Sequence, residues 1–394
     1  MKKLFIAIFA FVFLTCKDPY VAPVSAPDVG YLVVEGVVNS GAGNTKIRLS
    51  RTTPLTDGTR AIETGASVMI QNESGGNRFL AETAHGDYEV NDLNLDPTAK
   101  YRLRVVTHNK EYVSDFVPVN NNPAIDSVSW SYSGDGASVN VNTHDDQNIA
   151  KYFMWDFVET WEIHSDYTPN CKFNSPSDPY WVVYVDPIKY WTIDSSKYQC
   201  WRSDTSTQIL LGSTIKYAVD TISSTLSVIP TGSEKISYLY SMNVRQYTLT
   251  KDAFEFMQKM KKNSEQLGSV FDAQPTELQG NIHNTQNPDE IVIGYLSICQ
   301  AQEKRNFVRN QDLPDWNYSS GCFLYNEQPN DRGYALNNFY YPDHVTPFII
   351  PVQYQQRNPS DPPPAGYIIT YSAANIKCVD CTQRGTTNKP PFWP

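Results

Sequence analysis

A cysteine near the start of the chain stands where lipid-attachment chemistry requires one. Two lysines precede an apolar run, Leu4–Leu14, and only Thr15 separates this run from Cys16. A short basic region followed by such a run is typical of a secretory signal, and the run is too short to span a bilayer. We therefore predict that residues 1–15 are removed and that Cys16 is lipidated. A plain signal peptide with an incidental cysteine, or an uncleaved anchor, is the alternative.

Six further cysteines remain for disulfide chemistry. Removing Cys16 from the seven in the chain leaves an even set, which in an exported protein implies up to three disulfides. The Cys-Val-Asp-Cys spacing near the C-terminus also fits a redox motif or half a zinc site, but it lies in a polar tail without a nearby histidine. We favour a structural disulfide there, and the full connectivity stays open. Short loops close most readily, which favours the pairs Cys171–Cys200, Cys299–Cys322 and Cys378–Cys381.

The acidic and imidazole side chains show no catalytic or metal-binding spacing. Asp145-Asp146 and Asp289-Glu290 have the chemistry for calcium binding or acid–base catalysis, but adjacent acids on loops are usually solvated. None of the six histidines forms a His-Glu-x-x-His pair, and neither a Gly-x-Ser-x-Gly elbow nor a phosphate-binding loop occurs. We therefore predict no catalytic residue, no metal and no cofactor.

Charge and aromatic content narrow the classes of partner. Without Lys2 and Lys3 the formal net charge changes from −10 to −12. This disfavours nucleic acid, because its binding requires Lys and Arg to neutralise phosphates. The 25 tyrosines and 8 tryptophans indicate β-rich structure with aromatic packing. These aromatic residues could form a platform for a glycan or peptide ligand. We favour the alternative, that they pack in the core and across strands.

The first part of the chain has the sequence pattern of short β-strands. Residues 16–29 are rich in Pro, Ala and Ser and predict an extended, lipidated tether. Residues 30–119 predict a β-sandwich of immunoglobulin-like architecture, and the segment after Gly86 resembles carboxypeptidase-regulatory-like modules. The strand-like runs include Tyr31–Val38, Thr45–Ser50, Ala66–Ile70, Asp87–Val90, Tyr101–Val106 and Glu111–Asp115.

A larger β-rich domain, residues 120–394, follows three consecutive asparagines. It contains a polar, aromatic insertion at 163–200 and one prominent helix, predicted at about 251–267. Thr250 fits the N-cap of this helix and Gly268 its stop. The apolar residues that share one helical face predict core packing rather than a cofactor site; they are Ala253, Phe256, Met257 and Met260.

The block from residue 240 to 296 carries a family resemblance. Together with the signal and the sandwich, it resembles the Bacteroidota lipoprotein family called domain of unknown function 4249. That family has no established catalytic residues, so the resemblance assigns none here, and we favour structural roles for the block. The matching segments are Tyr240-Ser-Met-Asn-Val-Arg-Gln246, Leu267-Gly-Ser-Val-Phe-Asp-Ala-Gln-Pro275, Leu278-Gln-Gly-Asn-Ile282, Asn287-Pro-Asp-Glu-Ile-Val-Ile-Gly-Tyr295, Cys378-Val-Asp-Cys381 and Lys389-Pro-Pro-Phe-Trp393.

The resemblance implies an outer-membrane lipoprotein encoded beside TonB-dependent receptors. Lys17-Asp18 is a short version of the acidic signal for surface export in that phylum, so we expect a surface-exposed protein held in the bilayer by acylated Cys16. The leading hypothesis is a non-enzymatic protein that captures a nutrient, such as a glycan, peptide or metal chelate, for a TonB-dependent transporter. A structural component of envelope assembly without a small ligand is the alternative. A carboxylate-based surface hydrolase is the third hypothesis.

Overall fold

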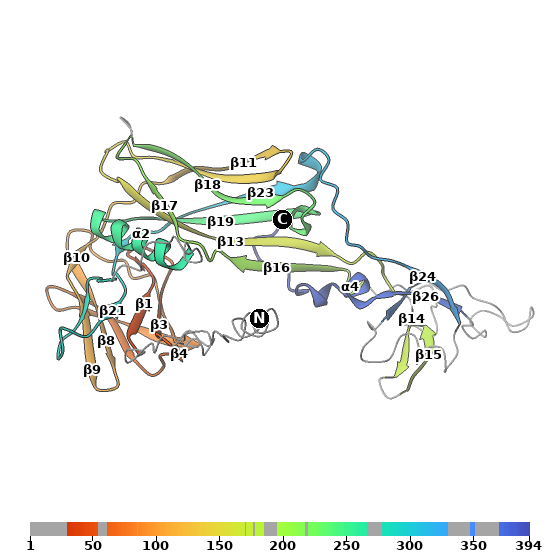
Figure 1. Cartoon of the computed structure of the whole chain (residues 1–394), viewed down its shortest axis with the longest axis horizontal. Coiled ribbons are helices and arrows are strands. Elements are labelled where there is room, and N and C mark those ends of the chain that lie inside the picture. Colours follow the sequence, from red (N-terminus) through yellow and green to blue (C-terminus); the bar gives the residue numbers. More distant parts are fainter. Residues whose placement is uncertain are drawn as a thin grey trace, which may run out of the picture.

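The computed structural model is mainly β, as predicted: 49% of the structure is in strands and 10% is helical. Figure 1 shows three parts that follow one another along the long axis, namely a first β-sandwich, a second β-sandwich and a distal lobe. Within the described part of the chain, no helix is long and apolar enough to cross a bilayer. The structure describes residues 30–53, 61–84, 86–169, 171–175, 178–184, 195–216, 220–265, 278–329, 347–350 and 370–394.

The first β-sandwich is one eleven-stranded sheet that folds over a common core. Its strand order is β20-β9-β8-β5-β6-β7-β3-β1-β21, with β10 on β8 and β4 on β3. Alternate side chains point into the core, as in β8, where Tyr101, Leu103 and Val105 are buried. The predicted N-terminal sandwich is confirmed. Its strands are β1 (Leu32–Glu35), β3 (Asn44–Arg51), β4 (Ala61–Ile62), β5 (Ser67–Asn72), β6 (Asn77–Ala84), β7 (Asp87–Asn91), β8 (Lys100–Thr107), β9 (Lys110–Ser114), β10 (Val117–Pro118), β20 (Ile282–Asn284) and β21 (Val292–Ile293).

Residues 282–299 return to the first β-sandwich, although the sequence analysis assigned them to the second domain. β20 pairs with β9, β21 lies parallel to β1, and β22 (Ile298–Cys299) lies parallel to β2 (Val38–Asn39). The return requires two glycines, because an ideal Cβ on Gly280 would lie 1.6 Å from the carbonyl oxygen of Gly294. Consecutive strands usually neighbour each other, and this late return breaks that tendency.

The second β-sandwich packs a three-stranded sheet, β11-β12-β18, against a five-stranded sheet, β16-β13-β19-β23 with β17 on β13. Val141 of β12 and Trp155 of β13 belong to the same buried cluster between the sheets. β13 has 13 residues and so spans about 40 Å. The elements are β11 (Ile125–Ser133), β12 (Gly136–His144), β13 (Tyr152–His164), β16 (Gln199–Thr205), β17 (Leu210–Ser213), β18 (Thr221–Pro230), η1 (Glu234–Ile236), β19 (Leu239–Thr248), β23 (Gln302–Arg309) and η2 (Asn310–Asp312).

Helix α2 (Lys251–Glu265) lies at the seam between the two β-sandwiches and confirms the predicted helix. The Thr250 hydroxyl caps it by accepting a backbone N–H of the first turn at 3.2 Å. One side of α2 packs on β13 and β17. Phe256 contacts Tyr295 of the returning segment, with 5.6 Å between ring centroids. The predicted apolar face therefore joins the two sandwiches.

The buried amide of Gln246 joins the asparagine-rich linker to both sheets of the second β-sandwich. Its Oε1 accepts hydrogen bonds from Thr143 of β12 at 2.7 Å and from Trp155 of β13 at 2.9 Å. Its Nε2 donates to the Pro123 carbonyl at 2.9 Å, and Asn122 Nδ2 donates to the Gln246 carbonyl at 2.7 Å. The asparagines that mark the domain boundary in the sequence thus include a buried polar anchor.

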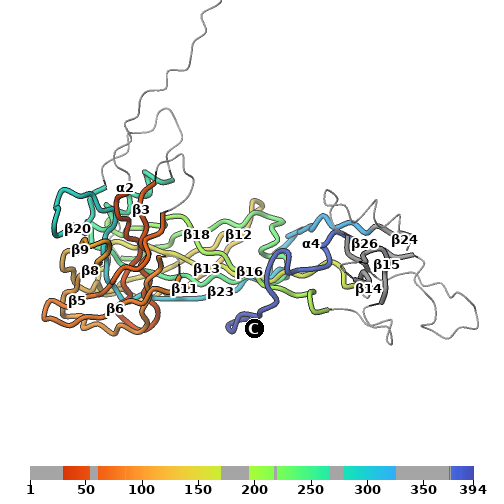
Figure 2. The backbone as a smooth tube through the Cα atoms, turned by 90° about the horizontal axis from the view of Figure 1, so that it is seen from below, coloured from red at the N-terminus to blue at the C-terminus, as the bar shows by residue number. Residues whose placement is uncertain are grey.

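The distal lobe lies at the end of the molecule remote from the first β-sandwich (Figure 2). Its strands form a hairpin, β14-β15, and a small sheet, β24-β26-β25. Ala374, Cys378 and Val379 form its described core, against which Tyr167 packs. The elements are β14 (Cys171–Ser175), β15 (Asp178–Tyr184), β24 (Tyr325–Pro329), β25 (Pro347–Ile350), β26 (Thr370–Asn375), α4 (Ile376–Val379) and η3 (Cys381–Gln383).

The disulfides differ from the pairs that sequence proximity favoured. Cys200 pairs with Cys381 and Cys322 with Cys378, across 181 and 56 residues. Each doubling of a loop costs only about 0.6 kcal/mol of closure entropy, so the fold easily overrides proximity. Cys299 is a buried free thiol, and burial raises its pKa to about 12. The even cysteine count therefore gives no support to lipidation of Cys16, which lies outside the described residues, as does the side chain of Cys171.

Replacing Gln246 tests the linker contact. Gln246→Leu leaves the buried Thr143 hydroxyl and Trp155 N–H without their acceptor, so we expect the free energy of unfolding to fall by about 2–4 kcal/mol in urea denaturation. Gln147 is exposed on a loop, and Gln147→Leu should change it by less than about 0.5 kcal/mol. Equal stability of the two variants would show that Gln246 is not an anchor.

Peptide mapping without reduction tests the disulfides. We expect cross-linked peptides that contain Cys200 with Cys381 and Cys322 with Cys378. Cys299 should react with iodoacetamide only after unfolding, because it is buried and its thiol stays protonated. A peptide that links Cys378 to Cys381 would contradict the observed pairing.

Candidate functional site

A groove opens where the second β-sandwich meets the distal lobe. It has a polar cavity of about 700 Å³, within the usual range for small-molecule sites. A second cavity of about 250 Å³ adjoins it and shares Tyr318 and Ser320. We call the larger cavity the junction groove. Its lining residues are His164, Asp166, Ser237, Tyr238, Asn310, Leu313, Asp315, Trp316, Asn317, Tyr318, Ser319 and Ser320.

An aromatic cluster forms part of the groove wall. The ring centroid of His164, the last residue of β13, lies 3.7 Å from that of Tyr238 and 4.7 Å from that of Tyr198. Tyr238 is still 42% exposed and lines the groove. The imidazole packs against the tyrosine ring at an interplanar angle of 34°, so the position of the tyrosine ring is set before any ligand arrives.

Glu162 fixes the imidazole from the same side of β13. Its Oε1 lies 2.6 Å from His164 Nε2 and accepts from Gln199 Nε2 at 2.6 Å, and its Oε2 accepts the Trp393 indole N–H at 3.0 Å. The hydrogen bond with His164, and then those with Trp393 and Gln199, outweigh burial and lower the pKa of Glu162 below its ordinary value of 4.5. An ionised carboxylate therefore holds the ring at neutral pH.

The loop after η2 presents polar groups to the groove because its apolar residues are anchored in the core. Leu313 and Trp316 are buried in the core of the second β-sandwich, and the Trp316 indole donates to the Ser233 carbonyl at 3.0 Å. Asp315 and Asn317 flank Trp316 and are exposed. Among the described residues, neither side chain has a hydrogen-bond partner. Both are therefore available to a ligand.

Arg384 connects the C-terminal segment to the groove. Its guanidinium pairs with Glu234 through Nη1 and donates to the His164 carbonyl through Nη2 at 2.8 Å. Glu234 also accepts the Tyr318 hydroxyl at 3.1 Å. Burial and then the Glu234 charge raise the pKa of Tyr318 to about 12. Tyr318 thus lines both cavities as a neutral phenol.

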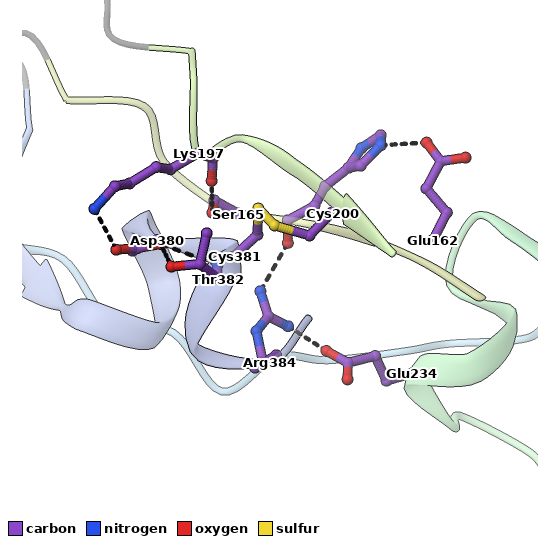
Figure 3. The surroundings of a disulfide bond; sticks show 10 residues. Glu162, Ser165, Lys197, Cys200, Glu234, Asp380, Cys381, Thr382 and Arg384 are labelled. Atoms are coloured by element: carbon purple, nitrogen blue, oxygen red, sulfur yellow. Dashed lines mark hydrogen bonds and ion pairs between the residues drawn. A yellow bond between two sulfur atoms is a disulfide. The ribbon is translucent and has the colours of Figure 1, made fainter. Parts of the chain in front are cut away.

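The Cys200–Cys381 disulfide holds this segment against β16. Figure 3 shows the bond with Arg384 and Glu234 on one side and the Lys197–Asp380 ion pair on the other. The Lys197 Nζ to Asp380 Oδ2 distance is 2.7 Å. One covalent bond and two ion pairs therefore keep the groove wall and the C-terminal segment together.

The two cavities differ in charge. The junction groove has no Lys or Arg among its lining residues. Lys377 and Arg384 line the smaller cavity, as does Phe323, which is 75% exposed. Among the lining residues, positively charged side chains therefore occur only in the smaller cavity.

The paired carboxylates that the sequence singled out lie elsewhere and support local structure. Asp145 Oδ2 accepts the backbone N–H groups of Ile149 and Ala150 at 2.8 and 2.7 Å. Glu290 accepts the Tyr112 hydroxyl at 2.7 Å, which ties the returning segment to β9. Neither pair lines the junction groove.

One cluster of metal-ligand types occurs in the part of the chain that the structure describes. It comprises Asp166, Cys322 and Cys378. Because the two cysteines form a disulfide, they are not available as thiolate ligands. The absence of a metal or cofactor stays a prediction.

No pattern in the sequence marks the groove residues. They come from three separate segments, 164–166, 237–238 and 310–320, and none forms a motif. The one available signal was the aromatic insertion at 163–200, whose ends supply His164 and Tyr198.

Comparisons with known proteins identify a family but no function. A family model described as a domain of unknown function, DUF4249, matches residues 17–305. No curated protein matches. Among solved structures, the chicken interferon gamma receptor alpha chain is 10% identical, with 56% of this chain and 90% of that chain covered at a TM-score of 0.14. A "putative carbohydrate binding protein" from Bacteroides uniformis is 9% identical, with 56% and 91% covered at a TM-score of 0.16. TM-scores this low establish no shared fold.

The pKa of Glu162 predicts a pH-dependent contribution to stability. A lowered carboxyl pKa stabilises the fold above the unfolded value, 4.5, and this contribution is lost as pH falls through the folded value. Glu162→Gln should therefore lower the free energy of unfolding by about 1–3 kcal/mol at pH 7, and the difference should shrink below pH 4.5.

Glu255→Gln is the matched control, because Glu255 is exposed on α2 and pairs only within the helix. Urea denaturation between pH 3 and 7 measures both variants. A deficit of Glu162→Gln that stays constant over this range would contradict an ionised Glu162.

Proposed function

This chain belongs to the family described as domain of unknown function 4249, and we propose that it is a lipid-anchored, non-enzymatic binding protein of the outer membrane. In this proposal, acylated Cys16 holds the chain at the cell surface, and the junction groove holds the ligand. A TonB-dependent receptor is the partner that takes the ligand up. The separation of the groove from the first β-sandwich, where the described part of the chain begins, is the observation that carries the proposal.

The described chain begins in the first β-sandwich, so the tether attaches there. Helix α2 packs at the start of β13 beside that sandwich, whereas His164 ends the same strand. The groove therefore lies about 40 Å beyond the seam. Residues 17–29 could add up to about 45 Å when extended. Such spacing supports ligand capture away from the bilayer.

The arrangement of the groove supports binding rather than catalysis. Glu162 fixes His164, but the imidazole Nδ1 is buried without a partner. A residue that acts as general base must have its proton-accepting atom within hydrogen-bond reach of the substrate. Tyr238 also lines the groove, and burial raises its pKa, so its ring remains a neutral contact surface.

Affinity purification from outer membranes tests the proposal. We expect the tagged wild-type protein, extracted in detergent, to recover a TonB-dependent receptor. Cys16→Ser should move the protein from the membrane to the soluble fraction, because no acyl chain then remains to anchor it. Mass spectrometry of the recovered proteins and of the N-terminal peptide provides the measurement.

Cys299→Ser is the control, because that thiol is buried and carries no disulfide. It should leave both fractionation and receptor recovery unchanged. Recovery of no receptor with an acylated, membrane-bound protein would refute the accessory role, and membrane retention of Cys16→Ser would refute the anchor.

A further inference from the structure

The charge of the junction groove limits the chemistry of its ligand. Its lining includes Asp166 and Asp315 but no Lys or Arg. Burying an anion there would place it beside carboxylates without a compensating cation. Leu313 and Trp316 are buried in the core, so most accessible lining atoms are polar. An anionic or purely apolar ligand therefore does not fit.

The supported ring of Tyr238 supplies the apolar contact. Its neighbour His164 is held by Glu162 and, through the backbone carbonyl, by Arg384. A flat, rigid ring at the edge of a polar cavity suits a ligand with one face of C–H groups and a rim of hydroxyls. Rigid aromatic surfaces bind at little cost in conformational entropy.

The loop residues supply groups that match hydroxyls. A carboxylate such as that of Asp315 can accept two hydrogen bonds side by side, and an amide such as that of Asn317 can both donate and accept. Their side chains have no hydrogen-bond partner among the described residues. Asp315 adopts a φ of 56°, a conformation uncommon outside glycine, which turns the loop between its buried anchors. Planar groups of this kind bind adjacent hydroxyls in pairs.

We propose that the junction groove binds a neutral oligosaccharide, with a sugar ring stacked on Tyr238 and hydroxyls bound by Asp315 and Asn317. This inference rests on the proposed binding function and names its ligand class. A volume of about 700 Å³ accommodates more than one sugar unit. The smaller cavity with Lys377 lies beyond Tyr318, so a longer chain would extend toward it.

Native affinity electrophoresis of the full-length protein in detergent tests this ligand class. The gels contain starch, glucomannan, arabinoxylan, laminarin, dextran or levan as neutral probes, and polygalacturonate or alginate as acidic probes. We expect retardation by at least one neutral polymer and by neither acidic polymer. Retardation by only an acidic polymer, or by none, overturns the inference. Receptor recovery is scored separately, so it can succeed when this test fails.

Variants locate the binding. Tyr238→Ala should weaken binding of the retarding polymer at least about tenfold, or about 1.4 kcal/mol, whereas Tyr238→Phe should retain it because the ring remains. Asp315→Ala should also weaken binding. Phe79 is 62% exposed on β6 of the first sandwich, and Phe79→Ala should have no effect. Melting temperatures confirm that each variant is folded. Unchanged binding by folded Tyr238→Ala, or a loss with Phe79→Ala, places the site elsewhere.

Discussion

The buried side chain of Gln246 is the constraint on which the relative placement of the parts depends. Its amide uses both oxygen lone pairs and a donor to join β12, β13 and the linker. A polar group in this position is costly unless each bond is made. The two sheets and the linker can therefore meet in one arrangement only, and an alternative register of β19 would leave the amide and its partners unsatisfied.

A second set of long-range contacts holds the wall of the junction groove in place. The C-terminal segment reaches back to β13 and β16 through Arg384, Trp393 and the Cys200–Cys381 disulfide. Trp393 acts through Glu162, which holds His164, which in turn supports Tyr238. Each step is a short hydrogen bond or a contact between tilted rings. The aromatic face of the groove thus depends on the last residues of the chain.

Local signals predicted the parts of the fold that local physics decides. The Thr250 cap and the apolar face of α2 are set within a few residues, and alternation in β8 shows directly which residues are buried. The returning segment, the disulfides and the groove depend on contacts between residues far apart in the sequence, such as Leu32 with Val292 and Cys200 with Cys381. A single sequence contains no periodicity for such contacts. Loop-closure entropy predicted the wrong cysteine pairs because its preference is weaker than the contacts of a folded core.

The seam between the sandwiches also bears on how a ligand is captured. Interfaces between domains usually permit hinge motion unless they are large and apolar or firmly bonded. Here α2 fills the seam with Phe254 and Phe256, the returning strands cross it, and Asn122 and Gln246 close it with buried hydrogen bonds. A hinge would have to break these contacts together. The groove therefore moves with the first β-sandwich as one body. Capture then depends on a preformed groove, which agrees with an aromatic ring and a loop that are held in place by the protein itself.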